Sequence, residues 1–209
     1  MVRYRCEALL PVEAAEYILE RDGSAFRSLV AESFNLQHLK FVQLWTCDGV
    51  DYARLLTRPR VSSWVPRPAL RLLPGRELAF IDTIRYDPEK LRKPPYVLHV
   101  RTELPVLGSK ADVSSSLTID YVAPNLTRQT LEGHINIHLA GVGSLAERMV
   151  RRSLQRTYER LPAVVGKWAQ YRAVVLQQPG GQAVLMAGRP AFAFSPCSAL
   201  QSPTPTQVT

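Results

Sequence analysis

The sequence predicts an α+β fold, in which a curved seven-stranded antiparallel sheet wraps around a long C-terminal helix and two short helices lie between strands 1 and 2. Three observations predict it. Short segments with alternating apolar and polar residues recur along the chain, and turn residues separate them at hairpin-scale intervals. Two short helical patterns follow the first of these segments. Residues 141–172 then form one long amphipathic pattern with helical spacing.

The first strand and both short helices come early in the chain. Residues 3–10 alternate charged with apolar side chains, which predicts a half-buried strand that ends at Pro11. Residues 12–19 form a helical pattern with acidic residues in its first turn, where they suit the positive end of a helix. Asp22-Gly23 breaks this helix, and Ser24 can cap a second helix over residues 24–34.

Six further strands are expected before the long helix. Asp48-Gly49 is a strong hairpin signal between the first two, and Pro124-Asn125 marks the turn before the last. Over residues 134–138, isoleucines alternate with histidine and asparagine, which predicts one buried and one exposed face. The six segments are residues 39–46, 50–57, 78–86, 96–104, 115–122 and 127–139.

The long helix carries apolar and small side chains at spacings of three and four, with arginines on the opposite face. A helix that packs on the core is the simplest interpretation. Its small side chains would widen the space between the helix and a bent sheet rather than fill it. Pro162 removes a backbone hydrogen bond and should kink the helix. The stripe comprises Ala146, Met149, Val150, Ser153, Leu154, Thr157, Leu161, Val164 and Trp168.

Size and composition indicate one domain with a substantial core, since the chain has 209 residues of which 46% are hydrophobic. We expect a domain over residues 1–177 and a disordered tail over residues 178–209, which are rich in Gly, Pro, Ser and Gln. The sequence contains neither a long apolar run nor a secretory signal pattern, and its three cysteines are scattered. These features favour an intracellular protein, cytoplasmic or peripheral at a membrane.

Residues 127–150, TRQTLEGHINIHLAGVGSLAERMV, place a glycine turn between an alternating strand and the terminal helix. Together with the order of elements over residues 1–175, this run resembles the START-like, or helix-grip, superfamily, which includes birch-pollen allergens and polyketide cyclases. Pro95-Tyr96 and residues 105–108 (PVLG) are similar to strand borders of the VASt type, plant and algal domains related to steroid-transfer proteins. The resemblance implies a cavity between sheet and helix that binds a hydrophobic ligand, commonly a lipid or sterol.

We therefore expect binding, and transfer between membranes, of a hydrophobic small molecule without catalysis and without a cofactor. The expected lining comes from the helix stripe and from the inward-facing positions of the strands. Ordinary core packing explains each of these residues equally well. The expected ligand-binding residues are Met149, Val150, Ser153, Leu154, Thr157, Leu161, Trp168, Ile135, Ile137, Leu117, Ile119, Tyr121, Leu98 and Val100.

Asp82 is a polar residue within a predicted strand, on the face of Phe80 and Ile84. An inward-facing, desolvated carboxyl group could orient a ligand hydroxyl or act as an acid or base. A buried ion pair or an outward orientation is the favoured interpretation. Two alternatives to a carrier stay open: a cyclase- or hydratase-like enzyme that uses the same cavity, and a non-catalytic adaptor with a collapsed cavity.

The formal net charge of +8 favours anionic partners. Residues 58–76 interleave arginines with tryptophan and leucine, which suits an anionic membrane surface, although a loop folded over the end of the sheet explains the pattern as well. We expect no nucleic acid partner, because no recognition signature is present, and no metal, because the four histidines share no ligand spacing. The expected membrane-contact residues are Arg58, Arg60, Trp64, Arg67 and Arg71.

Overall fold

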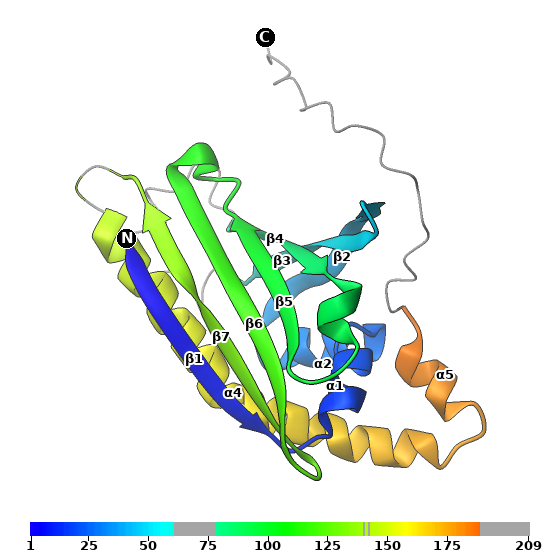
Figure 1. The fold of residues 1–209 in the computed structure, drawn as a ribbon. Coiled ribbons are helices and arrows are strands. Elements are labelled where there is room, and N and C mark those ends of the chain that lie inside the picture. The colour runs from blue at the N-terminus through cyan, green and yellow to red at the C-terminus, as the bar shows by residue number, and fades with distance from the viewer. Residues whose placement is uncertain (61–77, 140, 142, 189–209) are drawn as a thin grey trace.

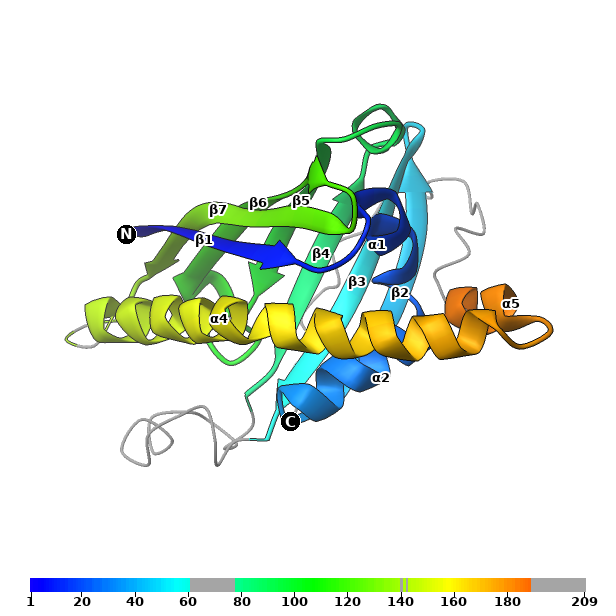
Figure 2. The same cartoon turned by 90° about the horizontal axis from the view of Figure 1, so that it is seen from below.

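The sheet and one long helix dominate the architecture. The computed structural model describes residues 1–60, 78–139, 141 and 143–188. Seven strands form one antiparallel sheet in the order β1-β7-β6-β5-β4-β3-β2. The sheet curves around helix α4, which crosses below it, and two short helices close one end (Figure 1 and Figure 2). The predicted α+β class and the order of elements are confirmed.

The elements follow each other as predicted, with small differences at their ends. The strands are β1 (Val2–Leu10), β2 (Leu36–Cys47), β3 (Val50–Pro59), β4 (Phe80–Tyr86), β5 (Tyr96–Glu103), β6 (Ala111–Ala123) and β7 (Leu126–Ile137). The helices are α1 (Ala14–Glu20), α2 (Ser24–Ser33), α4 (Gly143–Leu176) and α5 (Gly181–Met186), and the 3₁₀ turns are η3 (Pro88–Leu91) and η4 (Gly108–Lys110).

Alternation along the strands separates a buried inner face from an exposed outer face. In β1, every second residue from Tyr4 to Leu10 is buried, and the charged residues between them are exposed. In β7, Ile135 and Ile137 are buried, whereas His138 just beyond the strand is exposed. Because the side chains of a strand point alternately to opposite faces, these patterns fix which residues can face α4. The predicted faces of both strands are confirmed.

Two local features shape the sheet. Asp48 and Gly49 have φ angles of 51° and 71°, so both lie in the left-handed region that a two-residue type I′ hairpin requires. At Gly133 in β7, an added Cβ would lie 2.2 Å from the carbonyl oxygen of Ser114 in β6. Only glycine permits this close approach of two strands, at the point where the outer face is hollowed.

Helix α4 contacts the β1–β7 edge of the sheet and helix α2. Figure 1 shows it bending near its middle, where Pro162 leaves one carbonyl without its helical partner. The two halves are buried to different degrees. In the C-terminal half, Leu161, Val164 and Trp168 are buried, whereas the stripe from Ala146 to Thr157 is only half-buried.

The C-terminal half of α4 is held by a buried polar network to α1. The indole N–H of Trp168 donates to Glu20 Oε2 at 3.0 Å, and Arg172 Nε donates to Glu20 Oε1 at 2.8 Å. Arg172 also forms an ion pair of 2.6 Å with Glu16. The Trp168 ring packs edge-on against Phe26 of α2, with ring centroids 5.3 Å apart. Glu20 is only 1% exposed, so these hydrogen bonds take the place of the water that its carboxyl group loses on burial.

The structure differs from the sequence prediction at the start of the expected disordered tail. Residues 181–186 form α5, which packs against α1, α2 and α4. Leu185 is completely buried, and the backbone N–H and the hydroxyl of Ser24 both donate to the carbonyl oxygen of Ala187 at 2.9 Å. One buried leucine and the free N–H at the start of α2 order a segment whose composition alone predicts disorder. Residues 189–209 of that tail lie outside the described residues.

No helix within the described ranges is both long and apolar enough to cross a membrane.

Candidate ligand-binding site

The candidate site lies between the N-terminal half of α4 and the inner faces of β2 to β6, a region that we call the grip space. The α4 axis contacts the β1–β7 edge, and the remaining strands curve away from it (Figure 2). Side chains that point into this region are therefore only half-buried although they face inward. The apolar members from the sheet are Leu44, Leu55, Phe80 and Val100, and those from α4 are Ala146, Met149, Val150 and Leu154.

Asp82 points into the grip space from β4. Its register partners are Leu55 in β3 and Thr102 in β5, and both lie on the inner face. The Thr102 hydroxyl donates to Asp82 Oδ1 at 2.5 Å. Burial raises the pKa of the Asp82 carboxyl to about 6, and the Thr102 hydrogen bond only partly opposes this rise. The favoured sequence interpretation, a buried ion pair or an outward orientation, was wrong, since within the described part of the chain no cation offsets the charge of Asp82.

Two further polar side chains lie on the inner face, and the first of them, Tyr4, is close enough to feel the charge of Asp82. Tyr4 in β1 and Ser115 in β6 flank Gly133 of β7 in the same cross-strand row. Burial raises the pKa of the Tyr4 hydroxyl, the Ser115 side chain lowers it, and the negative charge of Asp82 raises it further. Near Asp82, the inner face thus carries the hydroxyl groups of Thr102, Tyr4 and Ser115 among apolar side chains, which suits a mostly apolar ligand with one polar end.

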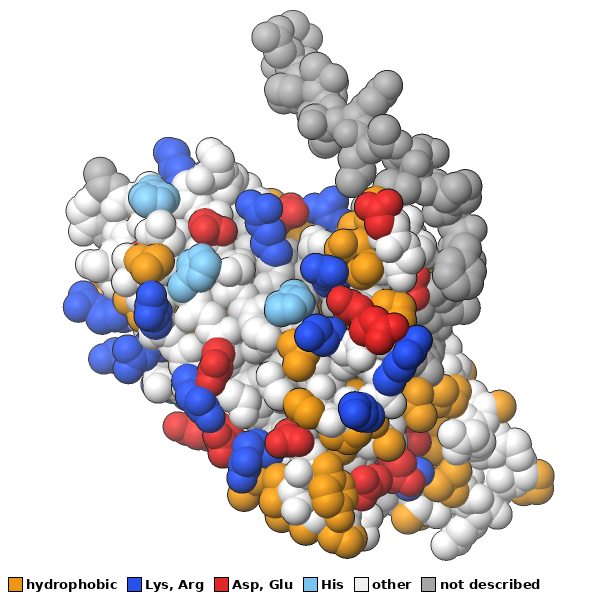
Figure 3. Space-filling model, in the orientation of Figure 1, with side chains coloured by type: hydrophobic (Ala, Val, Ile, Leu, Met, Phe, Trp, Pro, Cys, Tyr) orange, Lys and Arg blue, Asp and Glu red, His pale blue; other side chains and the backbone are white. Residues whose placement is uncertain are grey.

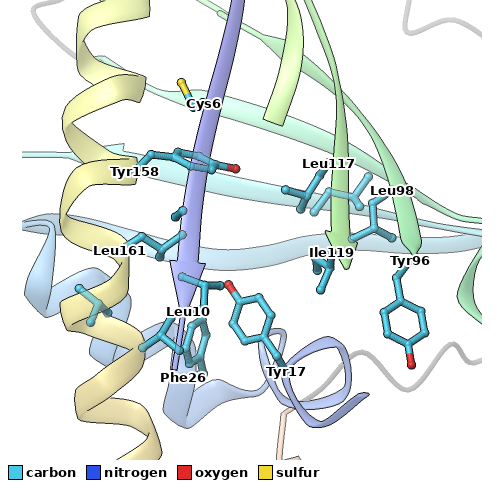
Figure 4. Packing of buried hydrophobic residues seen from close by; sticks show 14 of the residues in the cluster. Cys6, Leu10, Tyr17, Phe26, Tyr96, Leu98, Leu117, Ile119, Tyr158 and Leu161 are labelled. Carbon is cyan, nitrogen blue, oxygen red and sulfur yellow. The ribbon is translucent and has the colours of Figure 1, made fainter. Parts of the chain in front are cut away.

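A chain of buried hydrogen bonds closes the grip space toward α1. The Tyr17 hydroxyl donates to Gln129 Oε1 at 2.9 Å, and Gln129 Nε2 donates to the Tyr158 hydroxyl at 3.0 Å. Burial raises the pKa of Tyr17 to about 12 and that of Tyr158 as well, so both phenols stay neutral. Figure 4 shows Tyr158 reaching from α4 toward the sheet between Cys6 and Leu161. We take this chain as the end wall of the grip space.

The structure brings most of the predicted ligand-binding residues to one region. Met149, Val150, Ser153, Leu154 and Thr157 form the half-buried stripe of α4. The sheet supplies a buried set opposite or beside it, of which Leu98, Leu117 and Ile119 appear in Figure 4. That set is Leu98, Leu117, Ile119, Ile135 and Ile137, with Val100 half-buried among them.

Three predicted residues belong elsewhere in the molecule. Trp168 is enclosed by Phe26 and Glu20 at the α1–α2 end, and Leu161 is buried in the core near Leu10 (Figure 4). Tyr121 lies near the tip of the β6–β7 hairpin, where the strands extend beyond the core, and its side chain is 46% exposed. Alternation along β6 correctly indicates the face of Tyr121 but not where the layer opposite that face ends.

The predicted membrane-contact residues fall only partly within the described structure. Arg58 lies near the end of β3 and is half-buried, and Arg60 follows the strand and is exposed. The backbone N–H of Arg60 donates to the carbonyl oxygen of Asn35 at 3.2 Å. Trp64, Arg67 and Arg71 lie outside the described residues.

The described residues also form two hollows at the surface. One, of about 520 Å³, lies at the N-terminus of α4 beside Ile137 and Glu147. Another, of about 490 Å³, lies on the outer face of the sheet over β4 to β7. Among the residues that the structure describes, no three His, Cys, Asp or Glu side chains come together as a metal site would require.

Neither a protein-family model nor a curated protein matches the sequence. Solved structures do match the fold. The Zhui aromatase/cyclase from Streptomyces sp. R1128 has a TM-score of 0.51 and 14% identity, covering 82% of this chain and 95% of that one. The fold is the helix-grip fold. The matches also include a START superfamily protein from Mycobacterium smegmatis (TM-score 0.48, 12% identity, 79% of this chain and 98% of that one) and Ara h 8.0201 (TM-score 0.48, 12% identity, 79% and 98%).

Sequence reasoning missed several residues that shape the site. Thr102 donates to Asp82, Ser115 interacts with Tyr4, whose pKa the charge of Asp82 raises, and Gln129 links Tyr17 to Tyr158 across the core. Alternation places Thr102, Ser115, Tyr4 and Gln129 on the inner faces of their strands. Their proximity depends on the pairing register, which no local pattern in the sequence contains.

Proposed function

We propose that this protein binds a hydrophobic small molecule of the lipid or sterol class in the grip space. The observation that carries the proposal is the accessible apolar surface of inward-facing side chains, on α4 and on the sheet strands that curve away from it. Covering this surface with an apolar ligand would contribute about 25 cal/mol per Å² before the costs of association. Asp82 and Thr102 supply a polar anchor for a ligand hydroxyl.

The finer part of the proposal concerns biological role. The resemblance to VASt-type domains supports a sterol-like ligand and its transfer between membranes. The net positive charge and the arginine-rich residues 58–76 support contact with an anionic membrane surface during loading and release. Ligand transfer between vesicles, measured with and without anionic lipid, tests this part separately from binding.

The binding experiment uses paired tryptophan substitutions on α4. Ser153 is on the half-buried stripe, and Gln155 is exposed on the opposite side of the same turn. Ser153→Trp should fill the grip space and abolish uptake of a fluorescent sterol, whereas Gln155→Trp should bind like the unmodified protein. Native mass spectrometry of the purified protein should show a co-purifying lipid that Ser153→Trp lacks.

Equal ligand content in both variants would contradict the proposed site. A protein that carries no lipid and takes up no sterol in any form would instead support the adaptor with a collapsed grip space.

An enzyme of the cyclase or hydratase kind is the second candidate function. The observation in its favour is Asp82, because a carboxyl group whose pKa lies near 6 can exchange a proton close to neutral pH. Asp82→Asn separates the two functions. A carrier should retain ligand binding and show no turnover in either form, whereas an enzyme should retain binding and lose turnover of a polyketide-like or unsaturated substrate.

A further inference from the structure

The hollow of about 490 Å³ on the outer face of the sheet is built from an ordered grid of polar side chains. It lies on the face turned away from α4, and the grip-space ligand plays no part in it. Figure 3 shows basic side chains, of lysine or arginine, and histidine side chains distributed over this face of the molecule. A ligand in this outer hollow would therefore be separate from the proposed ligand of the grip space.

Strand pairing places the polar side chains in two neighbouring rows. Side chains directly opposite each other in such rows lie about 5 Å apart, and successive outward positions on one strand lie about 7 Å apart. The spacing lets several of them reach one small group at once. One row is Thr83, Arg101, Ser114 and His134, and the other is Arg85, His99, Ser116 and Glu132.

Among the outward-facing side chains of these two rows, Arg101 carries a positive charge that no ion pair offsets within the described residues. Glu132 pairs with Arg5 at 2.5 Å, Arg85 pairs with Asp87 at 3.4 Å, and Asp112 lies 3.4 Å from His134. Arg54 binds the neighbouring Glu103 at 2.7 Å. Glu132, Asp87 and Glu103 near the hollow thus each have an arginine partner, while Arg101 has no ion-pair partner among the described residues. A guanidinium left free in a hollow favours an anionic ligand.

Hydrogen-bond donors surround this guanidinium. Ser114 lies beside Arg101 in the same row, and its hydroxyl is 3.3 Å from His134 Nδ1. Ser116 and His99 stand opposite each other in the next row. Hydroxyl, imidazole and guanidinium groups together match the oxygens of a phosphate group.

The hollow extends beyond the space that a phosphate group alone would occupy. At its β3 side it is lined by Tyr52, whose ring stacks on Trp45 with centroids 5.2 Å apart and an interplanar angle of 8°. The stack gives this side a rigid aromatic wall. We propose that the outer hollow binds a phosphomonoester, with Arg101 as the anchor of the phosphate and Ser114, Ser116 and His99 as its hydrogen-bond donors.

The test compares two arginine substitutions that change the charge equally. Arg101→Gln removes the anchor, and Arg148→Gln removes an exposed arginine on α4. Titration of ¹⁵N-labelled protein with inorganic phosphate and with adenosine monophosphate should give saturable shifts of the amide signals of residues 99–101 and 114–116. Arg101→Gln should weaken the affinity by about ten-fold or more, whereas Arg148→Gln should leave it unchanged.

Two sources of the phosphate group are distinguished by vesicle binding. Vesicles of phosphatidylcholine with phosphatidic acid should bind the protein in an Arg101-dependent manner if the ligand is a lipid headgroup. Saturable binding of adenosine monophosphate without vesicle binding identifies a soluble ester. Shifts that do not saturate, or an equal loss of affinity in Arg101→Gln and Arg148→Gln, would overturn the proposal, since a diffuse positive charge would then explain the interaction. Thermal unfolding of both variants confirms that each is folded.

Discussion

The two halves of helix α4 differ in how the rest of the molecule covers them. The C-terminal half packs on α1, α2 and α5, and a buried carboxylate, Glu20, holds both Trp168 and Arg172. The N-terminal half lies along the β1–β7 edge and leaves its stripe half-buried. One half of the helix stabilises the fold, and the other keeps its apolar stripe half-buried, where we propose that a ligand binds.

Trp168→Ala should have the largest effect on the free energy of unfolding, because it removes central contacts of the C-terminal half of α4. The substitution opens a cavity beside Phe26 and leaves the carboxylate of Glu20 without one of its two donors. We expect the free energy of unfolding to fall by about 4 kcal/mol, measured by urea denaturation. Met149→Ala, in the half-buried stripe of the other half, is the control and should cost about 1 kcal/mol or less. Equal losses in the two variants would remove the distinction between the halves.

Leu185→Ala tests whether α5 belongs to the stabilising half. The Leu185 side chain is completely buried, so its truncation should lower the free energy of unfolding by about 3 kcal/mol. Hydrogen exchange should also become faster at the backbone N–H of Ser24, which donates to the carbonyl oxygen of Ala187. Val184→Ala, at a neighbouring position that is 50% exposed, should change little. A neutral Leu185→Ala variant would mean that α5 adds no stability.

Asp82→Asn tests how the buried carboxyl group of the candidate site changes the stability of the protein with pH. The folded state raises the pKa of Asp82 from 3.8 to about 6, so it favours the protonated carboxyl. The contribution of this group to stability is therefore fully present below about pH 4 and is lost as the pH rises through 6. At pH 8 the ionised carboxylate costs at most about 3 kcal/mol, at 1.36 kcal/mol per pKa unit.

Urea denaturation over a range of pH measures this effect. Asp82→Asn should raise the free energy of unfolding by about 2 kcal/mol at pH 8 and by nothing measurable at pH 4. Asp112→Asn, an exposed aspartate on the outer face of β6, is the control. A gain that is the same at both pH values would show that ionisation of Asp82 is not its cause.

Ser153→Ala should have the smallest effect on stability. The side chain lies on the half-buried stripe and makes no hydrogen bond with another described residue. The free energy of unfolding should therefore change by no more than about 0.5 kcal/mol, as measured by thermal unfolding. A loss above about 1 kcal/mol would show that the N-terminal half of α4 is packed as tightly as the C-terminal half.

Local patterns were enough to predict most of the fold. Alternation identified the buried faces of β1 and β7, Asp48-Gly49 identified a hairpin, and the stripe from Ala146 to Trp168 identified α4. Each of these signals depends on residues close together in the chain. The disorder expected from residue 178 was wrong for α5, because the burial of Leu185 depends on helices far away in the sequence.

The candidate site depends on contacts between segments that are far apart in the chain, which local sequence patterns do not reveal. Strand alternation placed Asp82 on the face of Phe80 and Ile84. It could not show that the partner of Asp82 on this face is the Thr102 hydroxyl rather than a cation. The same limit applies to Glu20, whose partners come from a helix nearly 150 positions later in the chain.

Local periodicity in the sequence was enough to predict the elements and to separate the inner from the outer side chains of strands such as β1 and β7. The tertiary structure was needed to show how far the sheet diverges from α4, which carboxyl groups are desolvated, and which outer-face arginines, Arg101 among them, have no acidic partner among the described residues. The difference arises from how far apart in the chain the interacting residues lie. Backbone periodicity follows from neighbouring residues, whereas burial and charge pairing arise from segments that meet only when strand register and helix docking are complete.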